Sequence, residues 1–153
     1  MPEPRTSADS PPLVLFICTG NYYRSRHAEA VLNWRARGLG RAVRAFSRGL
    51  LTSLVADEPT PLSPHTAARL GELGIPADLT APSPRQLAEE DLRRAHLTVA
   101  LRWGEHRKLM LREHPEWADR IEYWDVEDID EGPPDRALAR IEDEVERLLR
   151  RYA

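Results

Sequence analysis

The chain has a single cysteine, Cys18, among its 153 residues. One thiol excludes an intramolecular disulfide and a zinc site built from clustered cysteines. The longest apolar run, over 13–18, is far shorter than the roughly 20 residues that cross a bilayer. The 25 acidic and 22 basic residues nearly balance, which excludes the strongly basic surface of duplex-binding proteins. We therefore expect no membrane and no nucleic acid as partners.

The composition is that of one folded domain, with 41% hydrophobic and 31% charged residues. Residues 1–12 are polar and proline-rich, without the basic-then-apolar pattern of a secretion signal. We expect a disordered leader over 1–12, a single domain over 13–153 and a cytoplasmic location, as a monomer or weak dimer. The histidines show no zinc-ligand spacing, so no metal is expected.

Short apolar runs alternate with helical patterns along the chain. Strands are predicted at 13–17, 42–46, 97–101 and 120–124. Helices are predicted from residue 25 to about 37, and over 64–73, 87–95, 103–113 and 136–152. This order predicts an α/β fold, in which a parallel sheet is covered by helices on both faces in three layers. A ligand is expected beyond the carboxyl ends of the strands, where Cys18 lies.

The loop over 18–25, Cys-Thr-Gly-Asn-Tyr-Tyr-Arg-Ser, joins the first strand to the first helix. A helix N-terminus with its free backbone N–H groups binds phosphate-sized anions, and planar Arg24 can hold two oxygens of such an anion. The same positive field favours a nucleophilic thiolate at Cys18. Gly20 allows the loop to turn, and Asn21 tolerates a left-handed backbone. A buried structural cysteine is the alternative, but the strand before and the helix after favour an anion site.

The segment over 14–30, VLFICTGNYYRSRHAEA, resembles the phosphate loop of the low-molecular-weight protein tyrosine phosphatases. That family has a cysteine, five residues, an arginine and a serine or threonine, with Gly-Asn inside and Ala-Glu in the next helix. All of these residues are present here at the same spacing. A fainter resemblance extends over 47–49, 84–87 and the acidic stretch before the last helix. The resemblance implies a four-stranded parallel sheet, with an expected strand order of 2-1-3-4, and no cofactor.

The resemblance also implies a two-step hydrolysis of phosphate monoesters. Cys18 attacks phosphorus, a cysteinyl-phosphate forms, and water releases it, while Arg24 and the loop amides hold the oxygens. Ser25 is expected to hydrogen-bond the Cys18 sulfur, and Asn21 to brace the loop. The partner is a phosphorylated protein or small molecule, with phosphate or another oxyanion in the loop. The residues expected to bind it are Thr19, Gly20, Asn21, Tyr22, Tyr23 and Ser25.

A general acid is implied on the loop before the last helix, because the leaving oxygen needs a proton. Aligning Trp-Asp-Val-Glu-Asp, over 124–128, with the Trp-Asp-Val-Pro-Asp-Pro form of relatives places the acid at Asp128. Asp130 and Asp125 are the second and third choices, and a solvated acidic loop is the alternative. Ile129 replaces the usual proline, and the tyrosine pair that lines the entrance of phosphotyrosine-specific members is missing.

Two tyrosines distinguish this loop from the family pattern. Tyr23 stands where many members have a second cysteine, so no protective disulfide with Cys18 can form. Tyr22 stands where phosphoarginine-specific relatives have threonine and tyrosine-specific ones an aliphatic residue, which leaves the substrate open. Two other functions also stay open: an arsenate reductase that uses an external low-molecular-weight thiol, and a slow or inactive phosphate-binding module.

Overall fold

The computed structural model describes residues 11–152, so the predicted leader lies outside the described residues except for Pro11 and Pro12. Four parallel strands form one sheet in the order β2-β1-β3-β4, which confirms the predicted order 2-1-3-4. The strands are β1 (Leu13–Cys18), β2 (Arg44–Gly49), β3 (Leu97–Ala100) and β4 (Glu122–Tyr123).

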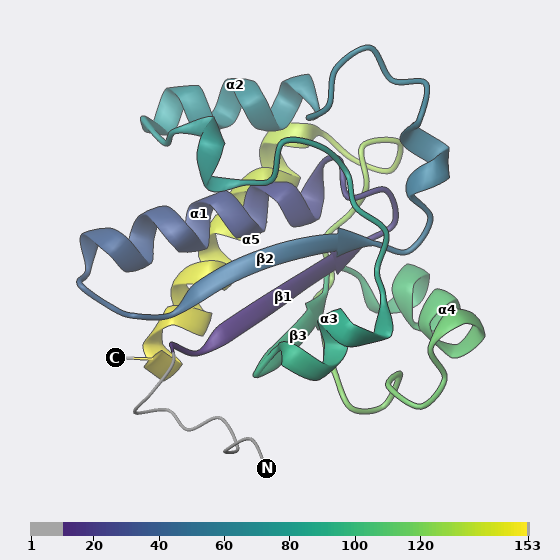
Figure 1. The fold of residues 1–153 in the computed structure, drawn as a ribbon. Helices are drawn as coiled ribbons and strands as arrows, with labels where there is room; N and C mark the ends of the chain where they lie inside the picture. Colours follow the sequence, from purple (N-terminus) through teal and green to yellow (C-terminus); the bar gives the residue numbers. More distant parts are fainter. Residues whose placement is uncertain (1–10, 153) are drawn as a thin grey trace.

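Helices cover both faces of the sheet, as the sequence predicts (Figure 1). One face carries α1 (Arg24–Gly38), α2 (Pro64–Leu73) and α5 (Pro134–Leu149). The other carries α3 (Glu89–Arg94) and α4 (Trp103–Glu113). Short 3-10 helices lie at Thr52–Val55, Ala77–Leu79 and Arg150–Tyr152. Within residues 11–152, no helix is long and apolar enough to cross a membrane.

The central strand β1 sends its side chains alternately into two cores. Val14 and Phe16 pack in the core beneath α1 and α5, whereas Leu15 and Ile17 pack in the core that includes Met110 of α4. All of these side chains are fully buried, and each contributes about 1.5–3 kcal/mol to stability. The continuous apolar run in the sequence therefore reflects a strand that is covered on both faces.

Two strands, β2 and β4, differ from the sequence prediction by more than one residue at their ends. The sequence predicts a turn at 47–49, but β2 runs through Gly49 because these residues pair with β1, with Gly49 opposite Cys18. The sheet thus continues to the residue at which the loop begins. At the edge of the sheet β4 is shorter than the predicted 120–124, because its register with β3 extends only over Glu122 and Tyr123.

Candidate active site

The loop between β1 and α1 is held against the chain that follows β2. The N–H groups of Leu50 and Leu51 donate to the carbonyl oxygens of Cys18 (3.0 Å) and Thr19 (2.7 Å). Asn21 has a φ of 54°, the left-handed conformation that the sequence predicts for this position. The loop therefore turns tightly and ends at the N-terminus of α1.

A chain of hydrogen bonds runs from the Cys18 thiol into the core. The Sγ atom of Cys18 lies 2.9 Å from Oγ of Ser25. Nδ2 of Asn21 donates to Oγ of Ser25 and to Oγ of Ser47, both at 2.9 Å, and Oγ of Ser47 donates to Oε1 of Glu29 at 2.6 Å. Because Asn21 supplies a hydrogen to Ser25, the Ser25 hydroxyl is free to donate its own hydrogen to the sulfur.

Arg26, in the first turn of α1, ties the loop to two neighbouring segments. Its fully buried guanidinium donates to the carbonyl oxygens of Asn21 (3.2 Å) and Pro61 (3.0 Å) and to Oγ1 of Thr80 (2.5 Å). The nearby carboxyl of Glu29 is also buried, which raises its pKa, although hydrogen bonds from two hydroxyls oppose the rise. The sequence does not identify Arg26 as part of the site.

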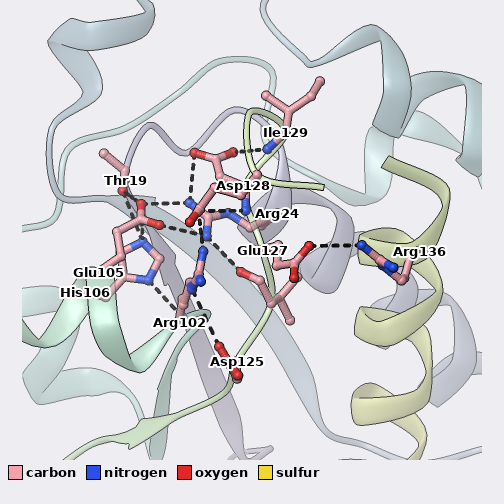
Figure 2. A network of polar contacts seen from close by, with 12 residues as sticks. Thr19, Arg24, Arg102, Glu105, His106, Asp125, Glu127, Asp128, Ile129 and Arg136 are labelled. Atoms are coloured by element: carbon pink, nitrogen blue, oxygen red, sulfur yellow. Dashed lines mark hydrogen bonds and ion pairs between the residues drawn. The ribbon is translucent and has the colours of Figure 1, made fainter. Parts of the chain in front are cut away.

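Arg24 lies at the centre of a polar network (Figure 2). Its guanidinium is 1% exposed and donates from Nη1 and Nη2 to the two carboxylate oxygens of Glu105, at 3.1 and 2.8 Å. Nη1 also donates to the carbonyl oxygen of Val126 (3.0 Å), and Nη2 lies 3.2 Å from Oδ2 of Asp128. Burial opposes the charge of Arg24, but these carboxylates and Cys18 raise its pKa above the ordinary value.

The three candidate aspartates lie in different surroundings. Asp128 lines the same pocket as Cys18 and pairs with Arg24. Asp125 is 74% exposed and lies 3.5 Å from Nε of Arg102, and Asp130 lines a neighbouring depression instead of the pocket. The structure therefore places Asp128, of these three residues, beside Arg24 in the pocket that Cys18 also lines.

A pocket of about 310 Å³ opens above Cys18. Its lining residues are Cys18, Gly20, Tyr22, Tyr23, Arg24, Val55, Glu58, Ser63, Pro64, His65, Asp128 and Ile129. Among the residues expected to bind substrate, Gly20, Tyr22 and Tyr23 thus line the pocket. The side chains of Thr19, Asn21 and Ser25 instead bond to neighbours of the loop.

Tyr23 lines the pocket, and its ring makes an edge-to-face contact with that of His65, at a centroid distance of 6.4 Å. Its buried hydroxyl has no hydrogen-bond partner among residues 11–152. Burial, with a smaller effect of Asp128, raises the pKa of Tyr23 to about 12, so the phenol stays neutral. In the same part of the chain no cluster of three or more His, Cys, Asp or Glu side chains is arranged to hold a metal.

Glu105 and His106, in the first turn of α4, join the site without any signal in the sequence. Oγ1 of Thr19 donates to Glu105 and lies 3.1 Å from Nε2 of His106. The N–H of Arg102 donates to Nδ1 of His106 at 2.9 Å, which places the histidine proton on Nε2. Burial lowers the pKa of His106, so the ring is neutral.

Strand β1 ends in a thiol that lines a pocket together with Arg24 at the N-terminus of α1, a combination typical of the class of cysteine-based phosphate-loop enzymes. The family model for low molecular weight phosphotyrosine protein phosphatase matches residues 13–153. The chain belongs to this family and is a cysteine-based phosphatase, which confirms the resemblance found in the sequence. No finding favours an arsenate reductase or an inactive binding module.

Solved structures of the family resemble the chain over most of its length. A low molecular weight protein tyrosine phosphatase from T. tengcongensis is 30% identical, with a TM-score of 0.76, over 92% of this chain and 99% of the other. YfkJ from Bacillus subtilis is 26% identical, with a TM-score of 0.74, over 92% of this chain and 93% of the other. The YwlE arginine phosphatase from Geobacillus stearothermophilus is 28% identical, with a TM-score of 0.71, over 92% of each chain. No curated protein sequence matches the chain.

Proposed function

We propose that the protein hydrolyses aryl phosphate monoesters of the phosphotyrosine type, with Cys18 as nucleophile. In the first step the Cys18 sulfur bonds to phosphorus, the ester P–O bond breaks, and the leaving oxygen takes a proton from Asp128. In the second step water attacks phosphorus, the S–P bond breaks, and Asp128 accepts a proton from the water. Phosphate leaves and the Cys18 thiolate is restored. The position of the Cys18 sulfur, beneath the pocket and beside Ser25, supports this order of events.

Arg24 and the loop amides are proposed to hold the three non-bridging oxygens of the phosphoryl group, whose charge the N–H donors stabilise in the transition state. Gly20 and Tyr23 lie in the wall around that group. Thr19, Asn21 and Ser25 are proposed to act through the loop, by fixing its shape and by stabilising the thiolate.

Asp128 is the proposed general acid because of a single observation, its 3.2 Å contact with Arg24 inside the pocket that holds Cys18. A phosphoryl group bound by Arg24 therefore lies next to the Asp128 carboxyl. Asp125 points to solvent and pairs with Arg102. The loop lacks the Asp-Pro pair of the family, but Arg102 also forms an ion pair with Glu131, so one arginine holds both ends of the loop.

The proposed preference for an aryl group rests on the walls of the pocket. Tyr22, Val55, Pro64 and Ile129 supply apolar surface above the thiol. The hydroxyl of Tyr22 lies 3.1 Å from Oγ1 of Thr60, so its polar end is engaged outside the pocket. A phosphorylated arginine is the second candidate substrate, because one of the similar structures is named an arginine phosphatase.

A cytoplasmic location is also proposed, because a nucleophilic thiol without a second cysteine to protect it depends on a reducing compartment. A monomer or weak dimer is proposed because the exposed large apolar side chains are spread over several elements of the fold.

The test is hydrolysis of para-nitrophenyl phosphate between pH 5 and 8 in the presence of a chelator. We expect turnover by the parent chain and none by Cys18→Ser. Peptides that carry phosphotyrosine or phosphoarginine then rank the substrates by kcat/KM. A folded parent chain that binds vanadate without turnover would contradict the proposal, and higher kcat/KM on phosphoarginine would contradict the aryl preference.

A further inference from the structure

Glu105 reaches Arg24 from a separate part of the chain. It lies in the first turn of α4, beyond the carboxyl end of β3, and its two oxygens accept hydrogen bonds from Nη1 and Nη2 of Arg24 (Figure 2). Its side chain is 26% exposed, whereas that of Arg24 is 1% exposed. A bidentate pair of this kind fixes the plane of the guanidinium as well as its charge.

The hydrogen-bond donors of Arg24 can be counted one by one. A guanidinium has five N–H groups, two on each Nη and one on Nε. Nη1 donates to Glu105 and Val126, and Nη2 donates to Glu105 and lies 3.2 Å from Oδ2 of Asp128, with which it forms an ion pair. Nε donates to no group within residues 11–152. The side of the guanidinium formed by Nε and Nη2 is therefore the side that a bound anion can use.

This arrangement leaves the anion and Asp128 on the same side of Arg24. An oxyanion that accepts from both Nε and Nη2 lies beside the Asp128 carboxylate, which is 3.2 Å from Nη2. Glu105 occupies the Nη1–Nη2 end, which an anion bound at the Nε–Nη2 side does not need. It thereby prevents the guanidinium from turning its Nη1–Nη2 end toward the phosphoryl group.

Glu105 is itself held in place. Oε2 of Glu105 accepts a hydrogen bond from Oγ1 of Thr19. The same oxygen lies 3.2 Å from Nε2 of His106. Burial opposes ionisation of Glu105, but the hydrogen bonds from His106 and Arg24 outweigh it and hold the pKa of this carboxyl well below its usual range. Since His106 is neutral, the charge of Glu105 is matched by Arg24.

We propose that Glu105 is a positioning residue for phosphoryl transfer, which holds the Nη1–Nη2 end of Arg24 so that its Nε–Nη2 side faces the phosphoryl group. The inference rests on the proposed role of Arg24 in binding that group. Glu105 also adds a negative charge close to a dianionic substrate, which weakens ground-state binding. Its benefit is therefore expected in the transition state, where alignment of the donors matters most.

The test compares Glu105→Gln with the parent chain and with Glu113→Gln. The glutamine keeps the length of the side chain but presents an N–H group to one Nη donor. Glu113 is exposed at the last residue of α4 and pairs with Arg112, so its variant removes a charge from the same helix without touching Arg24.

For Glu105→Gln we expect kcat on para-nitrophenyl phosphate to fall about 10- to 100-fold, as for other small misplacements of a catalytic group. Affinity for vanadate, which imitates the five-coordinate transition state, should fall by a similar factor. KM and inhibition by inorganic phosphate should change by less than about threefold, because the lost charge offsets the lost alignment. Glu113→Gln should match the parent chain in all four measurements.

Parental kcat and vanadate affinity in Glu105→Gln would overturn the inference. A rise in KM with unchanged kcat and a matching loss of vanadate and phosphate affinity would also overturn it, since that pattern indicates uniform loss of binding. Glu105→Ala, which removes the whole carboxylate, is a second variant, and if it fails to fold the isosteric Glu105→Gln still decides. If the parent chain shows no turnover, the proposed function fails, but vanadate affinity of parent and variant still tests the positioning of Arg24.

Discussion

Nδ2 of Asn21 lies 2.9 Å from Oγ of Ser25, and this amide determines which way the serine hydroxyl donates. Oδ1 of Asn21 accepts from the N–H of Arg85 at 2.9 Å, so the amide cannot turn over without losing that bond. The Ser25 hydrogen is thereby left for the Cys18 sulfur at 2.9 Å. A neutral side chain thus orients the hydrogen bond that the proposed nucleophile receives.

Ser25→Ala should lower kcat about 10- to 100-fold, because a hydrogen bond to a charged group contributes about 1.5–3 kcal/mol. The second step should slow most, since the sulfur must then leave as a thiolate. Rapid-mixing measurements should show a burst of para-nitrophenol followed by slow turnover. Ser53→Ala, at an exposed position, is the control. Slow turnover without a preceding burst would indicate that Ser25 acts in the first step instead.

Asp128→Asn should slow hydrolysis of phenyl phosphate far more than that of para-nitrophenyl phosphate. Phenolate is the poorer leaving group and depends more on a proton donor, which contributes about 10²- to 10⁴-fold. The comparison is the ratio of kcat for the two substrates in parent and variant. Asp125→Asn and Asp130→Asn should leave this ratio unchanged. A larger change in one of these variants would identify that aspartate as the general acid instead.

Glu142→Gln should destabilise the fold at neutral pH and have little effect in strong acid. Oε2 of Glu142 accepts from His27 and its two oxygens from Arg69, each at 2.9 Å. Burial opposes ionisation, yet these bonds lower the pKa of Glu142 from 4.5 to about 2. Because the folded-state pKa is depressed, the stabilisation is complete above the ordinary value and disappears as the pH falls toward 2.

Thermal unfolding at several pH values measures this effect. At pH 7 the loss should be about 1.5–3 kcal/mol, the usual contribution of hydrogen bonds to charged groups. The difference in Tm between parent and variant should shrink steadily below pH 4. Glu116→Gln, at an exposed site, should show no such trend. A difference that stayed constant down to pH 2 would mean that Glu142 acts through packing alone.

Gly49→Ala should disturb the phosphate loop directly. A Cβ atom on Gly49 would lie 2.9 Å from the backbone nitrogen of Asn21 and 2.7 Å from Cγ2 of Thr52. Since backbone must move, we expect a loss of about 1–3 kcal/mol together with reduced activity. Gly71→Ala, where a Cβ meets nothing within 4 Å, should keep both activity and stability. Equal behaviour of the two variants would refute this account.

The sequence predicts the part of the site that is local in the chain. The apolar run before Cys18, the loop and the helix that starts at Arg24 are contiguous, so their patterns specify a strand, a turn and a helix N-terminus together. The parallel sheet and its strand order follow from the alternation of elements and from the family resemblance. The left-handed Asn21 follows from the tolerance of asparagine for that conformation.

Glu105 could not be predicted in the same way. It lies 81 positions from Arg24, in a segment whose charges look like those of any solvated helix. Only the pairing of β3 with β1 brings α4 beside the loop. The extent of β2 also escaped prediction, because Ser47–Gly49 has the composition of a turn and its strand conformation depends on pairing with β1.

The proposed nucleophile, Cys18, ends strand β1, and every residue from Val14 to Ile17 is fully buried between two cores. Opening that strand exposes both cores at once, so local unfolding of the loop has a high free-energy cost. Backbone amides of β1 should therefore exchange with solvent only when the whole molecule unfolds. Denaturant should abolish activity and tertiary structure at the same midpoint, and the active site is expected to be among the last parts of the protein to lose its shape.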